Sequence, residues 1–150
     1  MTDTDLVTVT EIEQQVTPHP WNQKQFQQSL ESSHHCWTLE SDGEVIGYYL
    51  YSLVVGEAEI LNIAVAPNHQ GKGFGKQLLE HCLQQASQSA QMIFLEVRAS
   101  NFPAIQLYLH SDFNQIGERR DYYRTAHGSE DALVMAKELG NAAEDYGWNQ

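Results

Sequence analysis

The hydrophobic pattern of this chain changes its period once, and glycines stand at the point of change. Before that point, β-rich runs at residues 36–41, 44–56 and 57–67 predict an antiparallel meander of strands. After it, residues 73–89 carry apolar side chains at helical spacing, and residues 92–100 form a continuous apolar run, typical of a strand buried on both faces. A strand, a helix and a strand in this order predict a crossover that makes part of the sheet parallel. The predicted fold class is therefore α/β (α+β), with a mixed, mostly antiparallel sheet flanked by helices.

Weaker signals on either side complete the predicted domain. Residues 5–15 are poor in helix breakers and predict a first helix. Trp21–Leu30 predicts a second, amphipathic helix with Asn22 as its N-cap. A short helix is expected after Asn101, with Pro103 in its first turn, where the missing N–H costs nothing. The remaining residues predict a last hairpin with a long connection.

Length and charge limit what the chain can do. Its 150 residues suit one domain, which is expected to span residues 1–139 and to leave 140–150 as a polar tail. The net charge of −12 argues against nucleic-acid binding, which needs clustered Lys and Arg, and is compatible with a cationic peptide partner or simply with solubility. No apolar stretch is long enough to span a bilayer, and the N-terminus lacks signal-peptide features, so the cytoplasm is expected and no membrane partner.

The cysteines indicate neither disulfides nor a metal. Cys36 and Cys82 make no disulfide framework, which fits a reducing compartment. His34, His35 and Cys36 are consecutive, but neighbouring strand residues point to opposite faces, and no second ligand pair follows at zinc-like spacing. No metal is therefore expected.

The glycines at the change of period fit one phosphate-binding pattern better than two others. A Walker A loop fails because Lys76 is followed by Gln77, and a dinucleotide-binding fingerprint fails because Lys76 stands where it needs a third glycine. What remains is Gln70-x-x-Gly73-x-Gly75 directly after a strand and at the start of a helix. Such a loop presents backbone N–H groups to an anion at the positive end of the helix. An ordinary glycine-rich N-cap is the alternative.

This loop resembles the acetyl-coenzyme A loop of the GNAT superfamily of N-acetyltransferases, whose pattern is [RQ]-x-x-G-x-[GA]. The resemblance implies a parallel strand pair splayed to admit acetyl-CoA, with the loop on its pyrophosphate and the preceding strand on its pantetheine arm. Gly71 stands where the family often has Arg, so phosphate affinity would depend more on backbone donors and lysines. The implied coenzyme-binding residues are Ile63, Ala64, Val65, Gln70, Gly71, Lys72, Gly73, Phe74, Gly75, Lys76 and Asn101.

Three further runs narrow the resemblance to the N-terminal protein acetyltransferases, and among them to the bacterial ribosomal-protein-alanine type. They are ILNIAVAPNHQGKGFGKQLLEHCL, FLEVRASNFPAIQLY and GERRDYYRTAHGSEDALVM. The implied substrate is the N-terminal alanine of a basic protein, number eighteen of the small ribosomal subunit. Two departures stand out: the chain upstream of Ile12 is short for the family's first strand, which is expected to be truncated, and Asp112 replaces a usual Gly.

The resemblance assigns the proton acceptor to Glu96 and the proton donor for the leaving thiolate to Tyr108. Glu96 lies in an apolar strand, where an isolated charge is expensive. From the strand pattern alone, a structural ion pair with Arg98 on the same face is the alternative. Tyr108 shares a helical face with aliphatic side chains, so core packing is the alternative for it.

Three aromatic residues, Trp21, Tyr122 and Tyr123, are expected to form the walls of a peptide slot, or else to be lids on the core. Glu130 and Asp131 are expected near this slot or in a turn. The expected activity is direct transfer from acetyl-CoA by a monomer or weak dimer. Acetylation of lysine side chains or small amines, and a coenzyme-binding module without activity, are the alternatives.

Overall fold

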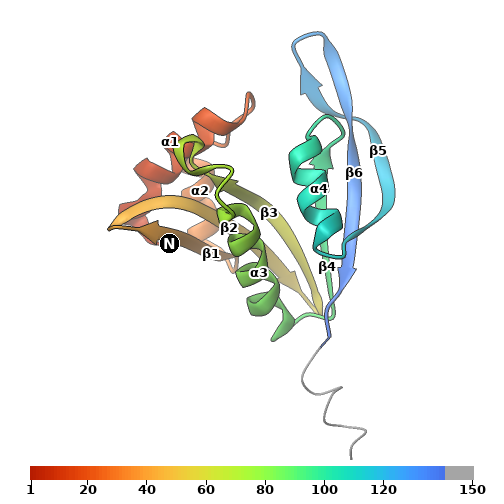
Figure 1. Ribbon diagram of the computed structural model, residues 1–150, viewed down its shortest axis with the longest axis horizontal. Helices are drawn as coiled ribbons and strands as arrows, with labels where there is room; N and C mark the ends of the chain where they lie inside the picture. Colours follow the sequence, from red (N-terminus) through yellow and green to blue (C-terminus); the bar gives the residue numbers. More distant parts are fainter. Residues whose placement is uncertain (141–150) are drawn as a thin grey trace, which may run out of the picture.

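The computed structural model describes residues 1–140, so the expected polar tail lies outside the described residues apart from Gly140. Six strands form one mixed sheet in the order β1-β2-β3-β4-β6-β5 (Figure 1). The strands are β1 (His35–Ser41), β2 (Glu44–Val54), β3 (Glu57–Val65), β4 (Met92–Arg98), β5 (Asn114–Thr125) and β6 (Gly128–Glu138). All neighbours are antiparallel except β3 and β4, as the predicted crossover requires.

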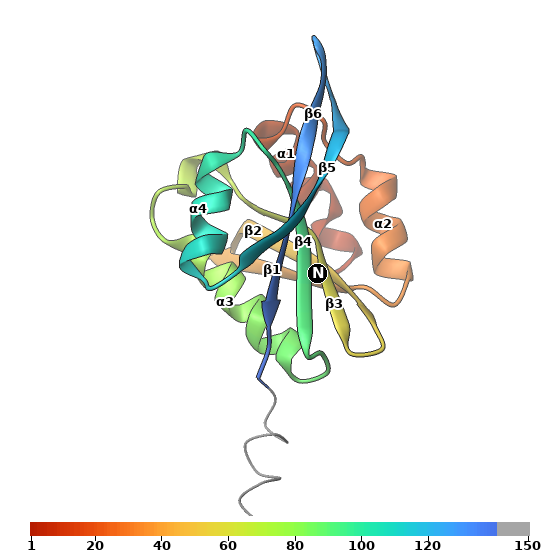
Figure 2. The same cartoon turned by 90° about the vertical axis from the view of Figure 1, so that its right-hand side faces the viewer.

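Within residues 1–140, four helices cover the two faces of the sheet (Figure 2). They are α1 (Leu6–Val16), α2 (Gln23–Glu31), α3 (Phe74–Ser87) and α4 (Phe102–His110), with short 3-10 turns η1 (Asp3–Asp5) and η2 (Pro67–His69). The predicted N-cap of α2 is confirmed, because the Asn22 side chain accepts from the Gln25 N–H. At the start of α4, the Asn101 side chain accepts from the Ala104 N–H in the same way. Both satisfy backbone donors that a helix start leaves free.

Each face of the sheet has its own core. On one face, α3 buries Leu78, Leu79, Cys82 and Ala86 against the strands, as the helical stripe predicted. On the other face, α1 and α2 pack on Tyr48 and Leu50 of β2. The predicted class of fold is confirmed, and the sheet holds its two helix layers apart.

The parallel pair is short, and the two strands then separate. Pairing between β3 and β4 covers only Glu57–Ile60 against Met92–Leu95, although β3 continues to Val65 and β4 to Arg98. Figure 1 shows the two strands diverging upward from their common lower end. The sheet therefore opens between two halves, as the family resemblance implied.

Three local expectations are corrected or resolved. In β4 only Ile93, Leu95 and Val97 are buried, while the alternate residues are half-buried, because the second face of β4 looks onto an open region instead of a helix. The last hairpin has a tight connection of two residues, between Thr125 and Gly128, because its strands are longer than expected. Asp112 adopts the left-handed conformation (φ 67°) usually reserved for Gly, one of the two solutions expected there.

Candidate functional site

The opening between β3 and β4 is bordered by backbone donors of β3. The Ala66 N–H donates to the Ile46 carbonyl of β2, at 2.8 Å. Because successive amides of a strand point to opposite sides, the Ala64 N–H also faces β2, and those of Ile63 and Val65 face the opening. Two of the three predicted backbone donors on β3 therefore face the opening, where β4 no longer pairs with β3.

The glycine loop follows β3 directly and begins α3. Gly71 and Gly73 have φ values of 76° and 88°, in the left-handed region that glycine adopts without strain. Gly73 is the N-cap residue of α3, and Gly75 lies within the first turn with ordinary helical geometry. The Gln70 side-chain amide donates to the Val65 carbonyl at 3.0 Å, which ties the loop to the end of β3.

The other predicted coenzyme-binding residues lie around this loop. Lys72 and Lys76 are exposed, and Lys76 makes a long ion pair with Glu80, at 3.9 Å. Phe74 is half-buried, with its ring 6.1 Å from that of His69. Asn101 is on the second half of the molecule, at the start of α4. The predicted set thus comes from both sides of the opening.

Glu96 lies on β4 with its side chain 17% exposed, and it is paired with an arginine that the sequence pattern did not indicate. The Arg119 Nε of β5 lies 2.8 Å from the Glu96 Oε1. The alternative partner, Arg98, instead contacts Glu130 at 3.4 Å and lies over the Tyr123 ring, 4.2 Å from its centroid. The alternative, an ion pair of Glu96 with Arg98, is therefore wrong, because β5 supplies Arg119 to Glu96 and β6 supplies Glu130 to Arg98.

Glu96 also borders a cleft of about 310 Å³ on the sheet face that carries α1 and α2. The cleft is lined by Ser52, Val54, Glu57, Ala58, Glu59, Phe94, Leu95, Glu96, Arg119 and Val134. The carboxylate of Glu96 is thus reachable from solvent while its charge is held beside a cation.

Tyr108 lies on α4, where it packs on Phe113 and belongs to the core beneath α3. Burial raises its pKa well above the ordinary value of 10.0, and the nearby Cys82 and Tyr123 side chains add to the effect. Its hydroxyl makes no hydrogen bond to any of residues 1–140. The side chain combines a buried ring, as core packing requires, with a protonated hydroxyl that has no protein partner in this part of the chain.

Trp21 is fixed on the α1–α2 loop by a buried carboxylate that sequence reasoning missed. Glu13 of α1 is only 3% exposed and accepts from the Trp21 backbone N–H (3.1 Å), the Tyr48 hydroxyl (2.7 Å) and the Asn62 side chain (2.9 Å). Three neutral donors satisfy this charge, as a buried carboxylate requires. A Glu on the apolar face of the predicted first helix is the one signal that could have indicated it.

Tyr122 and Tyr123 lie on β5, with ring centroids 5.1 Å apart. The Glu96 carboxylate, as hydrogen-bond acceptor and as a negative charge, raises the pKa of Tyr122. The Tyr122 ring also lies 5.3 Å from the Arg119 guanidinium. Burial chiefly raises the pKa of Tyr123. Both tyrosines therefore lie near the charged residues of β4, on one side of the opening.

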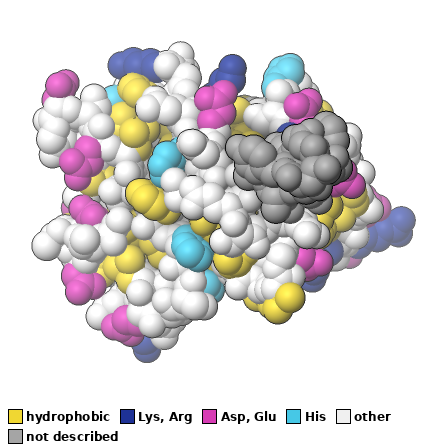
Figure 3. Space-filling view, turned by 90° about the horizontal axis from the view of Figure 1, so that it is seen from below, with side chains coloured by type: hydrophobic (Ala, Val, Ile, Leu, Met, Phe, Trp, Pro, Cys, Tyr) yellow, Lys and Arg dark blue, Asp and Glu magenta, His cyan; other side chains and the backbone are white. Residues whose placement is uncertain are grey.

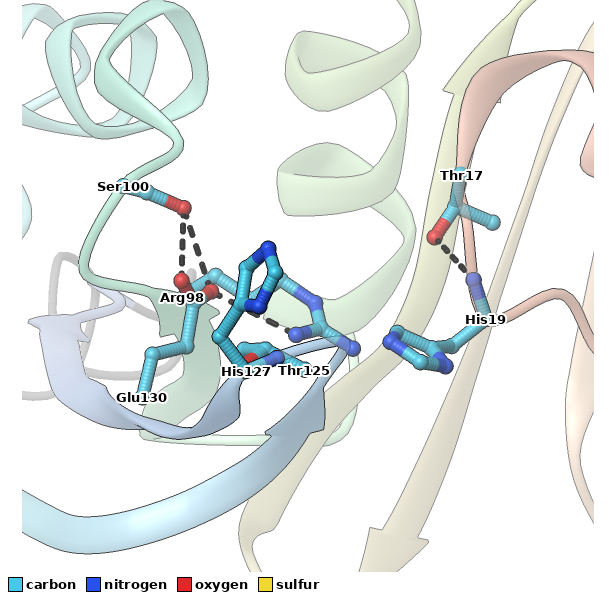
Figure 4. Close-up of polar contacts among 7 residues, drawn as sticks. All are labelled: Thr17, His19, Arg98, Ser100, Thr125, His127 and Glu130. Atoms are coloured by element: carbon cyan, nitrogen blue, oxygen red, sulfur yellow. Dashed lines mark hydrogen bonds and ion pairs between the residues drawn. The ribbon is translucent and has the colours of Figure 1, made fainter.

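Figure 4 shows Thr17 and His19 of the α1–α2 loop, and Thr125 and His127 where β5 turns into β6. In each loop a threonine hydroxyl accepts from a histidine N–H two residues later, at 3.3 Å: Thr17 from His19, and Thr125 from His127. Beside them, Ser100 and Arg98 both donate to the Glu130 carboxylate. Glu130 and Asp131 thus belong to β6 and not to a turn.

Two observations concern what residues 1–140 lack. No group of three or more His, Cys, Asp or Glu side chains among them is arranged to hold a metal ion. None of the helices formed by these residues is both long and apolar enough to cross a membrane.

A sheet that opens beside a glycine loop and a carboxylate is the arrangement expected of an acetyltransferase. Residues 6–113 match the model of the Acetyltransferase (GNAT) family. The chain belongs to this family, whose members use acetyl-CoA. It is 38% identical to the [ribosomal protein bS18]-alanine N-acetyltransferase of Escherichia coli (strain K12), over 89% of this chain and 90% of that relative.

Solved structures show the same relationship. The crystal structure of the ribosomal-protein-S18-alanine N-acetyltransferase from Escherichia coli superimposes with a TM-score of 0.90 at 36% identity, covering 97% of this chain and 94% of that one. Arabidopsis thaliana NAA60 in complex with a bisubstrate analogue superimposes with a TM-score of 0.81 at 19% identity, covering 93% and 95% of the two chains. That second likeness concerns the fold alone.

Proposed function

We propose that this protein transfers an acetyl group from acetyl-CoA to the N-terminal alanine of ribosomal protein bS18. The observation that carries this proposal is the 38% identity, over 89% of the chain, to an enzyme named for that reaction. The site supports it, because the Glu96 carboxylate borders a cleft that solvent can reach and lies beside Arg119, on one side of the opening of the sheet. A cytoplasmic location belongs to the same proposal, since a ribosomal protein is made there.

The proposed coenzyme site uses the backbone of one half of the molecule and side chains of both. The glycine loop offers N–H groups at the positive end of α3, and Lys72 and Lys76 add charge for the pyrophosphate. The Ile63 and Val65 amides face the opening, where they would pair with the pantetheine arm and the acetyl carbonyl. Asn101 would contact the coenzyme from α4.

In the proposed reaction, Glu96 takes the proton that an N-terminal ammonium must lose before its nitrogen can attack. A protein α-amine has a pKa of about 7.7–8.0, so one carboxylate suffices for this step near neutral pH. The nitrogen then forms a bond to the acetyl carbon, and the β3 amides hold the negative oxygen of the tetrahedral species. When the carbon–sulfur bond breaks, Tyr108 donates its proton to the thiolate. The nitrogen of the new amide loses its second proton to solvent, from which Tyr108 recovers one.

Arg119 gives this scheme a physical constraint. In the free protein its guanidinium occupies one oxygen of the Glu96 carboxylate, at 2.8 Å. More than half of the Arg119 side chain is exposed, so it can move aside or share the carboxylate when an ammonium arrives. The proposed base is thus oriented before the substrate binds.

Mass spectrometry of ribosomal proteins from cells with and without this protein tests the proposed function. An acetyl group on the N-terminal alanine of bS18 should be present only with the protein. A purified assay of coenzyme release separates the alternatives, because turnover with lysine peptides or polyamines and none with an alanine peptide would contradict the proposal. No release with any amine would indicate a module without activity.

A further inference from the structure

Two consecutive tyrosines of one strand point to the same side of the molecule, which ordinary strand geometry does not allow. Side chains of a strand alternate between the two faces. Arg98 is two residues from Glu96 on β4 and shares its face, and so do its cross-strand partner Ala132 and the partner of that residue, Arg119. Glu130 is two residues from Ala132 on β6, so its partner Tyr123 also lies on this face. Tyr122 should therefore point to the opposite face, towards α4. Instead its ring lies 5.1 Å from the Tyr123 ring and 5.3 Å from the guanidinium of Arg119, the residue paired with Glu96.

A bulge in β5 explains this exception. Arg119 pairs with Ala132 and Tyr123 pairs with Glu130, so the three residues 120–122 stand opposite Asp131 alone. Asp121, in the middle of the bulge, has a φ of 53°, which an L-residue seldom adopts. Extra residues in one strand bend it and redirect a side chain, and here the redirected side chain is that of Tyr122.

Two side chains of β6 hold the bulge in this shape. The Asp131 Oδ1 accepts from the Asp121 backbone N–H at 2.9 Å, and the Ser129 hydroxyl donates to the Asp121 Oδ1 at 2.7 Å. The Asp131 carbonyl meanwhile accepts from the Ala99 N–H at the end of β4, at 3.0 Å. Asp131 thus connects the bulge to the strand that carries Glu96. We call Asp121, Ser129 and Asp131 the bulge clasp.

We propose that Asp131 is a positioning residue: through the bulge clasp it turns Tyr122 towards Glu96, and so shapes the wall of the slot against which the substrate's N-terminus is held. Within residues 1–140 the Asp131 side chain makes no hydrogen bond to Glu96 or Tyr122, so its influence passes through the backbone of residues 120–122. This inference rests on the proposed function for its consequence in catalysis. The geometry of the clasp itself does not depend on which amine is acetylated.

The test compares Asp131→Ala, which removes the acceptor, with Asp131→Asn, which keeps an oxygen for the Asp121 N–H. Asp131→Ala is expected to lower kcat/KM for an alanine-initiated peptide by roughly 10- to 100-fold, since a displacement of about 1 Å at a site has effects of this size. Asp131→Asn should recover most of the loss. Acetyl-CoA affinity, measured by calorimetry, should stay unchanged in both, because the coenzyme loop lies on the other half of the molecule.

A double-mutant cycle distinguishes positioning from general support. In a Tyr122→Ala background, Asp131→Ala should cost little more, because the side chain it positions is already gone. An equal loss in both backgrounds, or a wild-type kcat/KM for Asp131→Ala, would overturn the proposal. If Asp131→Ala fails to fold, Ser129→Ala removes the second clasp bond alone. It should lower kcat/KM in the same direction by a smaller factor, and an unaffected Ser129→Ala would then decide against the clasp.

A spectroscopic measurement keeps this inference separate from the proposed function. In protein with ¹³C-labelled tyrosine, the Tyr122 resonance can be assigned with Tyr122→Phe and titrated. The pKa of Tyr122 should be raised in the wild type and fall back towards 10.0 in Asp131→Ala, because the ring moves away from the Glu96 carboxylate. An unchanged titration would refute the clasp. If the protein shows this change but acetylates no alanine peptide, the result would support the clasp and contradict the proposed function.

Discussion

Among single residues, Glu96 carries the only proton transfer in the proposed scheme that depends strongly on pH. Glu96→Gln keeps the shape of the side chain but removes the base. Its rate should be impaired most at low pH, where little of the substrate amine is neutral, and should recover partly as pH rises past the amine pKa near 8. A pH–rate profile beside that of the wild type measures this. A defect of the same size at all pH values would assign Glu96 a structural role through Arg119 instead.

Tyr108 makes a complementary prediction. Tyr108→Phe retains the buried ring and should slow turnover by roughly 10²- to 10⁴-fold with little change in acetyl-CoA affinity. Because the folded protein raises the pKa of Tyr108 above 10.0, its hydroxyl stays protonated through that pH, and the wild-type rate should show no fall there from its ionisation. Melting temperatures serve as the control. Wild-type turnover by Tyr108→Phe would mean that Tyr108 only packs in the core and donates no proton.

At the scale of elements, the glycine loop offers a matched pair of one-methyl substitutions. Gly73→Ala forces a side chain onto a φ of 88°, which costs roughly 1–2 kcal/mol and turns the following amides. Gly75→Ala adds its methyl in helical geometry, 3.7 Å from Leu107, an ordinary contact. Calorimetry should find acetyl-CoA affinity lowered only by Gly73→Ala. Equal affinities in both folded variants would show that the conformation of the loop does not contribute to coenzyme binding.

The elements themselves were predictable, because their signals are local. Asn22 and Asn101 indicated two helix starts, and the apolar stripe of α3 indicated its buried face. The pairing of Glu96 with Arg119 was not predictable, because it depends on the register of three strands and on the shift of that register between Gln115 and Gly117. Glu13 was missed for a related reason: its three donors come from segments up to 49 residues away in sequence.

For the whole molecule, the net charge of −12 predicts which peptides are preferred. Figure 3 shows acidic side chains scattered across one face, with Lys and Arg towards its rim. An alanine-initiated peptide with an early basic residue should therefore outperform an acidic one at low salt. The difference should shrink as salt rises, since charges are screened over about 8 Å at physiological ionic strength. Equal kcat/KM values at low salt would mean that the charge serves solubility only.

Only four residues of β3 pair with β4, so backbone pairing joins the two halves of the sheet along a short segment, which we call the seam. Beyond that seam, the Ile63 and Val65 amides lack a strand neighbour on the β4 side and should exchange hydrogen for deuterium faster than the Asn62 and Ala64 amides, which face β2. Acetyl-CoA in the opening would supply hydrogen-bond acceptors for these two amides. Its binding should slow the exchange of Ile63 and Val65 most, and so report on the seam before any acetyl group moves.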